Sequence, residues 1–460
     1  MSADSPFGKW MKNIPPVRVI TISFVLVILA GAVLLALPFT TRSGESTPFL
    51  DALFTSTSAT CVTGLIVFHT WTHWNVAGQI VILLLIQIGG LGLMTITTGF
   101  TLLLRRKLAL KDLVMARETT NGSNLNVAHL LRMVLIFTFA TELLGAAVLM
   151  IRFIPDFGAY GIWLSVFHSI AAFCNAGFDI LGFIPGNSSM NAYVGDPLVC
   201  VTLALLITVG GLGFIVISDI YLKKMHPLIQ RRHREHLNFH SLIVLISTVG
   251  ILLLGTGLIL GFEYHNTTLE GLNFFEKLNA AFFQTASSRT AGFASINLGL
   301  ETTVTKLITI LIMFVGASPA STGGGAKTTT VMVLLATVFS VLRGREDTTL
   351  LRRRIDQATV YRSIAIFFCA VAMILITSTV ILSTTPGVGA LDALFEATSA
   401  FSTTGVTTGI TPSLSVPSKI AVIITMFIGR VGPVSIALSM VIRKIRHSTA
   451  ILPEGKIIVG

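Results

Sequence analysis

Charged residues are scarce in this sequence. Only 12% of its 460 residues are charged, whereas 53% are hydrophobic and the mean hydropathy is +0.83. A soluble domain carries about twice that share of charge, so the composition excludes a soluble globular protein and is typical of a multi-pass membrane protein. The net charge of +11 could indicate a nucleic-acid partner, but the basic residues lie between apolar stretches. We therefore expect a lipid bilayer around the chain and no nucleic acid.

Cysteine is also scarce. The four cysteines are Cys61, Cys174, Cys200 and Cys369, and no two have the CxxC spacing of a zinc site. Cys61 and Cys174 each precede a repeated glycine by three residues. Small buried side chains behind a narrow loop explain them best, and a metal site or disulfide is the weaker alternative.

Long apolar stretches are abundant. A helix needs about 20 residues to cross a bilayer, and eight stretches reach that length: 19–39, 75–104, 131–154, 197–221, 241–263, 304–342, 363–384 and 419–442. No small-residue cleavage site follows the first of them, so we expect that helix to be retained. The longest polar linkers have about 20 residues, so no soluble domain is expected.

Basic residues cluster in five regions around these stretches. They are Lys9, Lys12, Arg18; Arg105, Arg106, Lys107, Lys111, Arg117; Lys223, Lys224, Arg231, Arg232, Arg234; Arg343, Arg345, Arg352, Arg353, Arg354, Arg362; and Arg443, Lys444, Arg446, Lys456. The positive-inside rule places all five in the cytoplasm. Both termini are then cytoplasmic, as an even number of spans requires.

A glycine motif recurs four times, once within each pair of apolar stretches. Its copies read Thr60-Cys61-Val62-Thr63-Gly64, Cys174-Asn175-Ala176-Gly177, Arg289-Thr290-Ala291-Gly292 and Ser402-Thr403-Thr404-Gly405. The glycines are 113 to 115 residues apart, and each follows a phenylalanine by ten residues: Phe54, Phe167, Phe282 and Phe395. This period indicates an internal repeat. We predict four short re-entrant helices that each end in a glycine loop.

The repeats predict the fold class. Each repeat crosses the membrane twice, so successive repeats have the same orientation about an axis along the membrane normal. We expect an all-α polytopic membrane protein with four helix–pore-loop–helix repeats, or eight transmembrane helices, in pseudo-fourfold symmetry around one central pore. The repeats are 1–110, 111–232, 233–350 with a broken second helix, and 351–460 with a cytoplasmic C-terminal tail.

The four glycine loops are the candidate ion-binding site, a selectivity filter for K⁺. Glycine allows the backbone to turn its carbonyl groups inward, and a ring of carbonyl oxygens can replace the hydration shell of a monovalent cation. The loops contain no carboxylate, which argues against a calcium-type acidic ring. The alternative is that they are tight turns between ordinary helices.

A candidate gate interrupts the sixth apolar stretch. It reads Gly316-Ala317-Ser318-Pro319-Ala320-Ser321-Thr322-Gly323-Gly324-Gly325-Ala326-Lys327. Proline and three consecutive glycines cannot continue a stable helix, so an irregular loop lining a cavity is expected near mid-membrane. A phosphate-binding loop is excluded because no glycine directly precedes the lysine. In the first two repeats, Gly89-Gly90-Leu91-Gly92 and Gly210-Gly211-Leu212-Gly213 are expected to allow close helix packing.

Four ionisable residues inside the apolar region need a role. Arg430 could form an electrostatic barrier in a cation path, or it could anchor the carbonyl groups of the loop. Lys327 is either an anchor at the end of the loop or a charge that reaches the cytoplasmic surface. Arg289 is expected to point away from the axis and to hold its loop, with an acidic neighbour. Glu142 is expected to be hydrogen-bonded, with proton coupling as the alternative.

Four acidic residues lie near the predicted outer side: Asp51, Glu276, Asp392 and Glu396. They could concentrate cations there. For any one of them, a solvated cap or a role at the start of a helix is the better explanation.

The glycine motifs and the Gly316–Lys327 segment resemble the Trk/Ktr/HKT superfamily of potassium transporters over essentially the whole chain. The start of the first repeat, within about 20 residues of the N-terminus, is more similar to the bacterial Ktr-type membrane subunits than to Trk-type proteins, which have extra spans. The resemblance implies K⁺ uptake across the bacterial plasma membrane, often Na⁺-dependent. It also implies a homodimer, with residues 451–460 near its interface, and a cytoplasmic nucleotide-binding ring subunit of the KtrA type.

Three other functions are alternatives to potassium transport. A sodium-selective or non-selective cation pathway is the alternative within transport, although a glycine in all four loops goes with potassium preference in the relatives. An intramembrane enzyme would need clustered catalytic groups, and the ten histidines do not cluster. A structural scaffold would not need the repeated loops.

Overall fold

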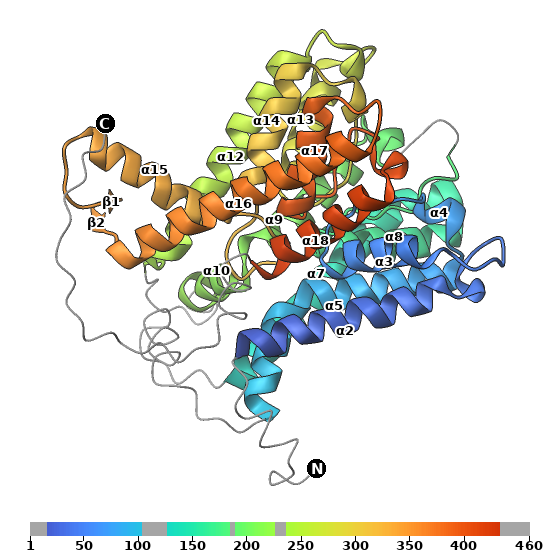
Figure 1. The fold of residues 1–460 in the computed structure, drawn as a ribbon, viewed down its shortest axis with the longest axis horizontal. Coiled ribbons are helices and arrows are strands. Elements are labelled where there is room, and N and C mark those ends of the chain that lie inside the picture. The colour runs from blue at the N-terminus through green and yellow to red at the C-terminus, as the bar shows by residue number, and fades with distance from the viewer. Residues whose placement is uncertain (1–15, 104–126, 185–188, 226–235, 433–460) are drawn as a thin grey trace.

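The computed structural model describes residues 16–103, 127–184, 189–225 and 236–432. These residues are predominantly helical, with one small hairpin of β1 (Thr349–Leu350) and β2 (Arg353–Arg354) among them. A long helix, a short helix and a further helix follow one another four times along the chain (Figure 1). The N-terminal basic residues before Pro16, most of the first two basic linkers and the C-terminal tail lie outside the described residues.

The helices have these bounds. The first long helices are α2 (Pro16–Ala36), α7 (Val127–Phe157), α12 (Phe239–Glu263) and α16 (Gln357–Thr384). The short helices are α3 (Phe49–Thr60), α8 (Tyr160–Phe173), α13 (Phe274–Ser288) and α17 (Ala390–Ser402). The closing helices are α5 (Val76–Leu103), α9 (Pro197–Leu212) with α10 (Phe214–Ile220), α14 (Thr303–Val315) with α15 (Thr328–Leu342), and α18 (Val416–Val431).

Short elements complete the connections. They are α4 (Thr70–His73), η1 (Pro38–Thr40), η2 (Asn191–Tyr193), η3 (Tyr221–Met225), η4 (Thr267–Leu269), η5 (Leu298–Leu300) and η6 (Thr411–Ser413). Most of them lie between a short helix and its closing helix, or at the start of a short helix.

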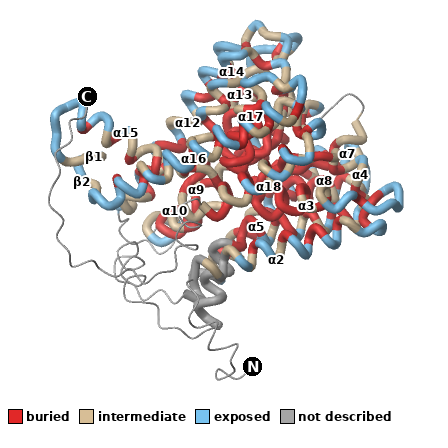
Figure 2. The backbone as a smooth tube through the Cα atoms, in the orientation of Figure 1, coloured by how far each residue is buried: buried red, intermediate tan, exposed pale blue. Residues whose placement is uncertain are grey.

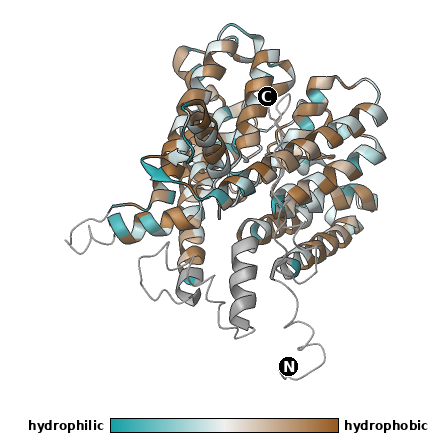
Figure 3. Ribbon diagram, turned by 60° about the vertical axis from the view of Figure 1, so that its left-hand side comes forward, coloured by the Kyte–Doolittle hydropathy of each residue, from teal (hydrophilic) through white to brown (hydrophobic). Residues whose placement is uncertain are grey.

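Several helices suit a bilayer. In the described ranges, α7, α12 and α16 are long and apolar enough to cross a membrane, and the bent pair α9–α10 is a fourth if it counts as one span. Leucines on α7 and α12 point outward: Leu143, Leu144, Leu253 and Leu254 are 68–72% exposed. Figure 3 shows that such apolar residues run along the outer helices. Exposed leucines of this kind match a lipid surface.

The short helices lie at the centre of the molecule. Figure 2 shows buried residues concentrated along α3, α8 and α17 and the helices around them. The phenylalanines of the repeated motif explain this burial in three repeats, because Phe54, Phe167 and Phe395 are fully buried. In the third repeat the fully buried ring is Phe283, while Phe282 is half-buried. The register of α13 is therefore shifted by one residue.

The closing helix of the second repeat is not the continuous span expected over 197–221. It ends at Leu212, and α10 leaves it at an angle of 95°. Gly213 has a φ of 91°, a conformation that favours glycine. The apolar stretch 197–221 thus forms two helices that meet at a bend, and the conformation at Gly213 depends on a partner from another repeat.

Candidate ion-binding loops and gating segment

Each short helix ends in a loop with two left-handed residues. The repeated glycines Gly64, Gly177, Gly292 and Gly405 have φ between 66° and 99°, and the residues two positions earlier, Val62, Asn175, Thr290 and Thr403, have φ between 50° and 71°. Left-handed backbone is costly for a residue with a side chain, so these loops must be held in place. Backbone bonds to the last turn of the helix do this, for example from Thr63 to Ser58 at 2.7 Å and from Thr404 to Ser399 at 2.9 Å.

The four loops meet one another in cyclic order. A β-carbon built on Gly64 would lie 2.6 Å from the carbonyl oxygen of Ala176. One on Gly177 would lie 2.7 Å from the oxygen of Ala291, and one on Gly292 would lie 2.6 Å from that of Thr404. A β-carbon on Gly405 would collide with the oxygen of Thr63, which closes the cycle. Only glycine fits at these positions, because any side chain would strike the next loop.

Oxygen atoms are the available ligands around these loops. Among the described residues, no group of three or more His, Cys, Asp or Glu side chains could hold a metal ion. The buried hydroxyl groups of Thr60, Thr63 and Thr403 have no hydrogen-bond partner. Backbone carbonyl and hydroxyl oxygens suit hard monovalent cations rather than transition metals.

Residues 316–327 lie directly against the glycine loops. A β-carbon on Gly323 would collide with Thr290, and one on Gly324 would collide with Thr403. The Thr322 hydroxyl donates to the carbonyl oxygen of Phe173 at 3.2 Å. We call residues 316–327 the gating segment from here on, after the role that the sequence predicts for them. It touches the loops or short helices of the second, third and fourth repeats.

The Lys327 side chain folds back on the gating segment. Its Nζ donates to the carbonyl oxygens of Gly323 at 2.6 Å and Gly324 at 3.4 Å. These bonds satisfy carbonyl groups that no helix uses. Of the two roles considered for Lys327, the anchor at the end of the loop is the one present in this structure.

The bend at Gly213 receives the other side of the gating segment. Ser318 donates its backbone N–H to Gly211 at 3.1 Å, and Thr322 donates to Gly210 at 3.3 Å. In return, the N–H of Phe214 donates to Ala320 at 2.9 Å. The interruption of α9 thus leaves backbone groups that the third repeat satisfies. The doublet Gly210-Gly211 alone did not reveal this partner.

Arg430 joins three repeats through carbonyl groups. Near the end of α18, its guanidinium donates to Gly89 at 2.5 Å and Gly90 at 3.4 Å on α5, and to Thr322 of the gating segment. It is only 5% exposed. Planar guanidinium groups suit several acceptors at once. This geometry agrees with the anchoring role, while the barrier role depends on where ions pass.

Comparison with known proteins decides the family. The family model described as "TrkH: Cation transport protein" matches residues 16–448. This chain belongs to the TrkH family of cation transport proteins. It is therefore a member of a transporter family and not of an enzyme family.

Two relatives are similar to this chain along nearly their whole length. The "Potassium/sodium uptake protein NtpJ" of Enterococcus hirae is 38% identical over 98% of both chains. The "Ktr system potassium uptake protein B" of Bacillus subtilis is 37% identical over 98% of both chains. The crystal structure of the potassium transporter TrkH from Vibrio parahaemolyticus covers 92% of this chain and 84% of its own, with a TM-score of 0.70 at 15% identity. That structure supports the fold alone.

The prediction of an acidic partner for Arg289 was wrong, because its partner is a hydroxyl group. Arg289 is only 4% exposed, and its guanidinium donates to the hydroxyl of Thr248 on α12 at 3.3 Å. No ion pair of Arg289 with a described residue is present. The side chain thus ties the third glycine loop to the long helix of its own repeat.

Glu142 lies beside Cys174, one of the four cysteines. Glu142 is buried and accepts hydrogen bonds from Nε2 of Gln87 at 3.1 and 3.2 Å. The Cys174 thiol points at the same pair, 3.5 Å from Oε1 of Gln87. All four cysteines are free, and only Cys369 is exposed. The hydrogen-bonded role of Glu142 is confirmed, and the disulfide alternative for Cys61 and Cys174 is wrong.

The four outer acidic residues have structural partners. Asp51 pairs with Lys419 at 2.7 Å, and Asp392 pairs with Lys306 at 3.1 Å. Lys306 and Lys419 each follow a repeated glycine by 14 residues, and each reaches the short helix of the next repeat in the cycle. This spacing is a signal for repeat contacts that sequence reasoning missed.

The two remaining acidic residues lie at different places in their helices, Glu276 in the first turn of α13 and Glu396 in the middle of α17. Glu276 forms a capping box with Asn273 at the start of α13. Glu396 is fully buried in α17 and accepts hydrogen bonds from Thr411 and, at 2.7 Å, from Thr407. The helix-start explanation is confirmed for Glu276. It was wrong for Glu396, whose buried carboxyl group instead binds the hydroxyl groups of the return loop.

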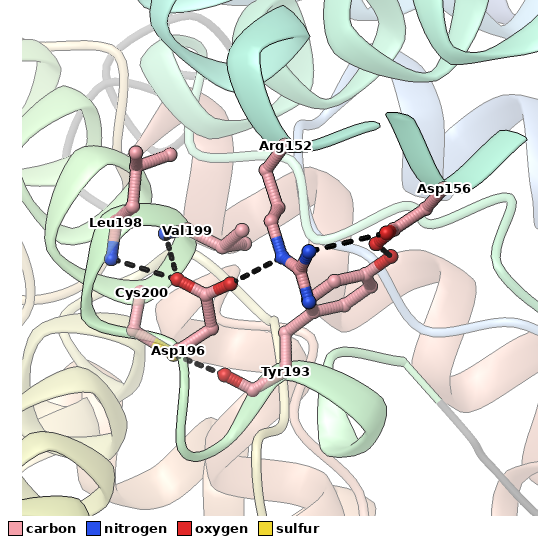
Figure 4. A network of polar contacts seen from close by, with 7 residues as sticks. All are labelled: Arg152, Asp156, Tyr193, Asp196, Leu198, Val199 and Cys200. Carbon is pink, nitrogen blue, oxygen red and sulfur yellow. Dashed lines mark hydrogen bonds and ion pairs between the residues drawn. The ribbon is translucent and has the colours of Figure 1, made fainter. Parts of the chain in front are cut away.

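A further polar network holds the second repeat (Figure 4). Arg152 on α7 bonds to Asp156 at 3.1 Å and to Asp196 at 2.7 Å. Asp196 also caps the first backbone N–H groups of α9, and Tyr193 donates to Asp156 at 2.9 Å. The end of α7 is thereby joined to the start of α9, which carries Gly210 and Gly211.

Proposed function

We propose that this protein takes up K⁺ across the bacterial plasma membrane through the ring of four glycine loops. The cyclic contact of Gly64, Gly177, Gly292 and Gly405 carries the proposal. Four loops from one chain can point carbonyl oxygens at one axis, where these oxygens would replace water around the ion. Each short helix also brings its C-terminal end, the negative end of its dipole, to the loops. The names of both close relatives include potassium uptake.

The proposed arrangement has four like-oriented repeats, at residues 1–110, 111–232, 233–350 and 351–460, with eight membrane spans in pseudo-fourfold symmetry. The four-times repeated helix order and the 113 to 115-residue period support it. Both termini would lie in the cytoplasm, because the positive-inside rule would place the basic linkers there.

In the proposed gating, residues 316–327 close the path beside the glycine loops. Contacts of Gly323 and Gly324 with Thr290 and Thr403 support this. Arg430 would hold the closed position through Thr322 and add a positive barrier to the cation path. Because the segment has mainly small residues, its displacement would open the path with little repacking.

Uptake is proposed to be Na⁺-dependent, and a homodimer with a cytoplasmic nucleotide-binding ring subunit of the KtrA type is the proposed assembly. Both ideas follow from the resemblance to Ktr-type proteins. The alternative function is a sodium-selective or non-selective cation pathway. It is favoured by one observation, the words "potassium/sodium" in the name of the Enterococcus relative.

Ion uptake into vesicles tests the proposal. Radioactive rubidium uptake by the purified protein, with K⁺ or Na⁺ as competitor, should be inhibited strongly by K⁺ and weakly by Na⁺. Gly292→Ser should abolish that preference, because its side chain would strike the carbonyl of Thr404. Gly250→Ser is the matched control, since a β-carbon on Gly250 meets nothing within 4 Å. Equal competition by both ions in the unmodified protein would favour the non-selective alternative.

A further inference from the structure

The junction between α12 and α14 holds two buried carboxyl groups that the proposed ion path does not use. Glu263 ends α12, and Glu301 follows turn η5, two residues before α14. Their exposed fractions are 0% and 6%. Turns η4 and η5 pack against each other at the same junction. Burial of two carboxyl groups at one place is costly unless each is compensated.

Glu263 is compensated by hydrogen-bond donors. Its carboxylate accepts from Asn266 at 2.5 Å and from Thr268 at 2.6 Å on one oxygen. The other oxygen accepts the backbone N–H of Thr302 at 2.9 Å. The Thr305 hydroxyl lies at the same place, 2.9 Å from the hydroxyl of Thr302. Donors of this number favour the ionised form of Glu263.

Glu301 is not compensated. Both of its carboxyl oxygens are buried, and neither has a hydrogen-bond partner among the described residues. The residue next to it, Thr302, donates to Glu263, so the two carboxyl groups share one small region. Lys306 is the nearby cation, but its Nζ pairs with Asp392 on α17 at 3.1 Å. Two unpartnered oxygens beside a second carboxylate are what a cation would complete.

We propose that Glu301 and Glu263, with the Thr305 hydroxyl, form a second cation site, which takes a small hard cation outside the ring of glycine loops. Carboxylate and hydroxyl oxygens are the ligands that sodium and calcium ions prefer. The few protein oxygens suit sodium, because calcium takes 6–8 ligands, whereas the local excess of carboxylates suits calcium. A cation here would join the end of α12 to the start of α14, the helix that leads into the gating segment.

A proton is the competing occupant. Burial, together with the charge of Glu263, raises the pKa of Glu301 to about 8, and Lys306 opposes this shift. Glu263 on α12 and Lys306 on α14 are the charged groups that act on Glu301, and Lys306 is itself paired with Asp392 on α17. Binding is therefore best measured above pH 8, where a proton no longer competes strongly.

Equilibrium binding to the purified full-length protein tests the site. Radioactive sodium and radioactive calcium are used in separate arms, with saturating KCl present to occupy the glycine loops. One of the two ions should bind, and Glu301→Gln should weaken that binding by about tenfold or more, since a charged ligand is lost. Glu270→Gln is the matched control, because Glu270 is an exposed carboxylate in the same connection. It should bind like the unmodified protein.

The sodium arm and the calcium arm identify the ion. Binding of neither ion, or equal binding by Glu301→Gln and the unmodified protein, would overturn the proposal. Thermal stabilisation by KCl reports whether Glu301→Gln is folded. If that variant does not fold, Thr305→Val replaces it, and unchanged binding in Thr305→Val would count against the site.

A role of this site in Na⁺-dependent uptake rests on the proposed function, but the binding assay does not. If the unmodified protein binds sodium at this site but takes up no rubidium, the proposed function alone is defeated. Intact uptake with no binding would defeat the second site alone.

Discussion

The first and second repeats carry the same four residues in their closing helices and use them differently. Gly89-Gly90-Leu91-Gly92 continues through α5 as one helix, whereas Gly210-Gly211-Leu212-Gly213 ends α9 in a 95° bend. The carbonyl groups of Gly89 and Gly90 receive the guanidinium of Arg430. Those of Gly210 and Gly211 receive backbone N–H groups of the gating segment.

The two doublets share one contact that explains their glycines. A β-carbon on Gly89 would collide with the carbonyl of Thr60, and one on Gly210 would collide with that of Phe173. Gly429 stands in the same relation to Phe401 in the fourth repeat. The glycine thus lets each closing helix approach the end of its own short helix. The partner that follows, a side chain or a loop, decides whether the helix continues.

The largest difference in stability between the two repeats should appear at the fourth residue of the Gly-Gly-Leu-Gly stretch. Gly213→Ala places a β-carbon 2.4 Å from the fixed carbonyl group of Pro319, too close for a side chain at a φ of 91°. Left-handed strain and overpacking together should cost roughly 3 kcal/mol or more. Gly92→Ala, in a continuous helix, avoids the strain of a positive φ and should cost clearly less. Thermal unfolding of both purified variants measures the contrast, and equal midpoints would show that the bend is not held at Gly213.

Arg430 is expected to give the next largest effect. Arg430→Gln removes charged hydrogen bonds to α5 and the gating segment, which should cost about 2–3 kcal/mol and raise cation leak through the vesicle membrane. Arg430→Lys keeps the charge but not the planar donors. A leak in Arg430→Gln alone would identify the charge as the barrier, and a leak in both variants would identify the anchor. Unchanged flux in folded Arg430→Gln would contradict the barrier role.

Alanine at the second glycine of the two doublets should lower stability by unequal amounts. A β-carbon on Gly90 would lie 2.8 Å from the sulfur of Cys174, whereas one on Gly211 has its nearest neighbour at 3.4 Å. Gly90→Ala should therefore cost about 1–2 kcal/mol, and Gly211→Ala should be close to neutral. Denaturation midpoints of the two variants test this order. Relief of the Gly90→Ala defect by Cys174→Ala would locate the collision.

The smallest expected effect concerns the hydroxyl of Thr322. Thr322→Val keeps the volume and removes the bond to Phe173, which should cost about 1 kcal/mol. The backbone bonds of Thr322 to Gly210 and Arg430 remain. Thr328→Val, which loses a bond from the start of α15 to Ser318 of the segment, is the matched control. A larger change in rubidium uptake with Thr322→Val than with Thr328→Val would show that the segment acts through the second repeat.

Much of the architecture could be read from periodicity. The four short helices and their glycine loops follow from a motif that returns every 113 to 115 residues, since equivalent sequences adopt equivalent local structures. The irregular backbone at 316–327 follows from Pro319 and three consecutive glycines. The register of α13 did not follow, because both Phe282 and Phe283 could fill the core and only packing selects one of them.

Partners that are far apart in the sequence, in the same repeat or in different ones, could not be read in the same way. An acidic neighbour was expected for Arg289, yet Thr248, 41 residues earlier, accepts its hydrogen bond. The pairs of Asp51 with Lys419 and of Asp392 with Lys306 join residues on different repeats. Such contacts depend on the order in which the repeats close around one another, and no local pattern encodes that order.

The amino-acid sequence by itself determined which segments are apolar, where the four glycine loops occur and where the third repeat must lose its helix, because hydropathy and backbone freedom are local properties. Only the tertiary structure decided that Gly213 bends its helix while Gly92 does not, and that Arg430 reaches Gly89 and Thr322. The reason is that a freed backbone carbonyl or N–H group needs a partner, and in this protein those partners come from other repeats.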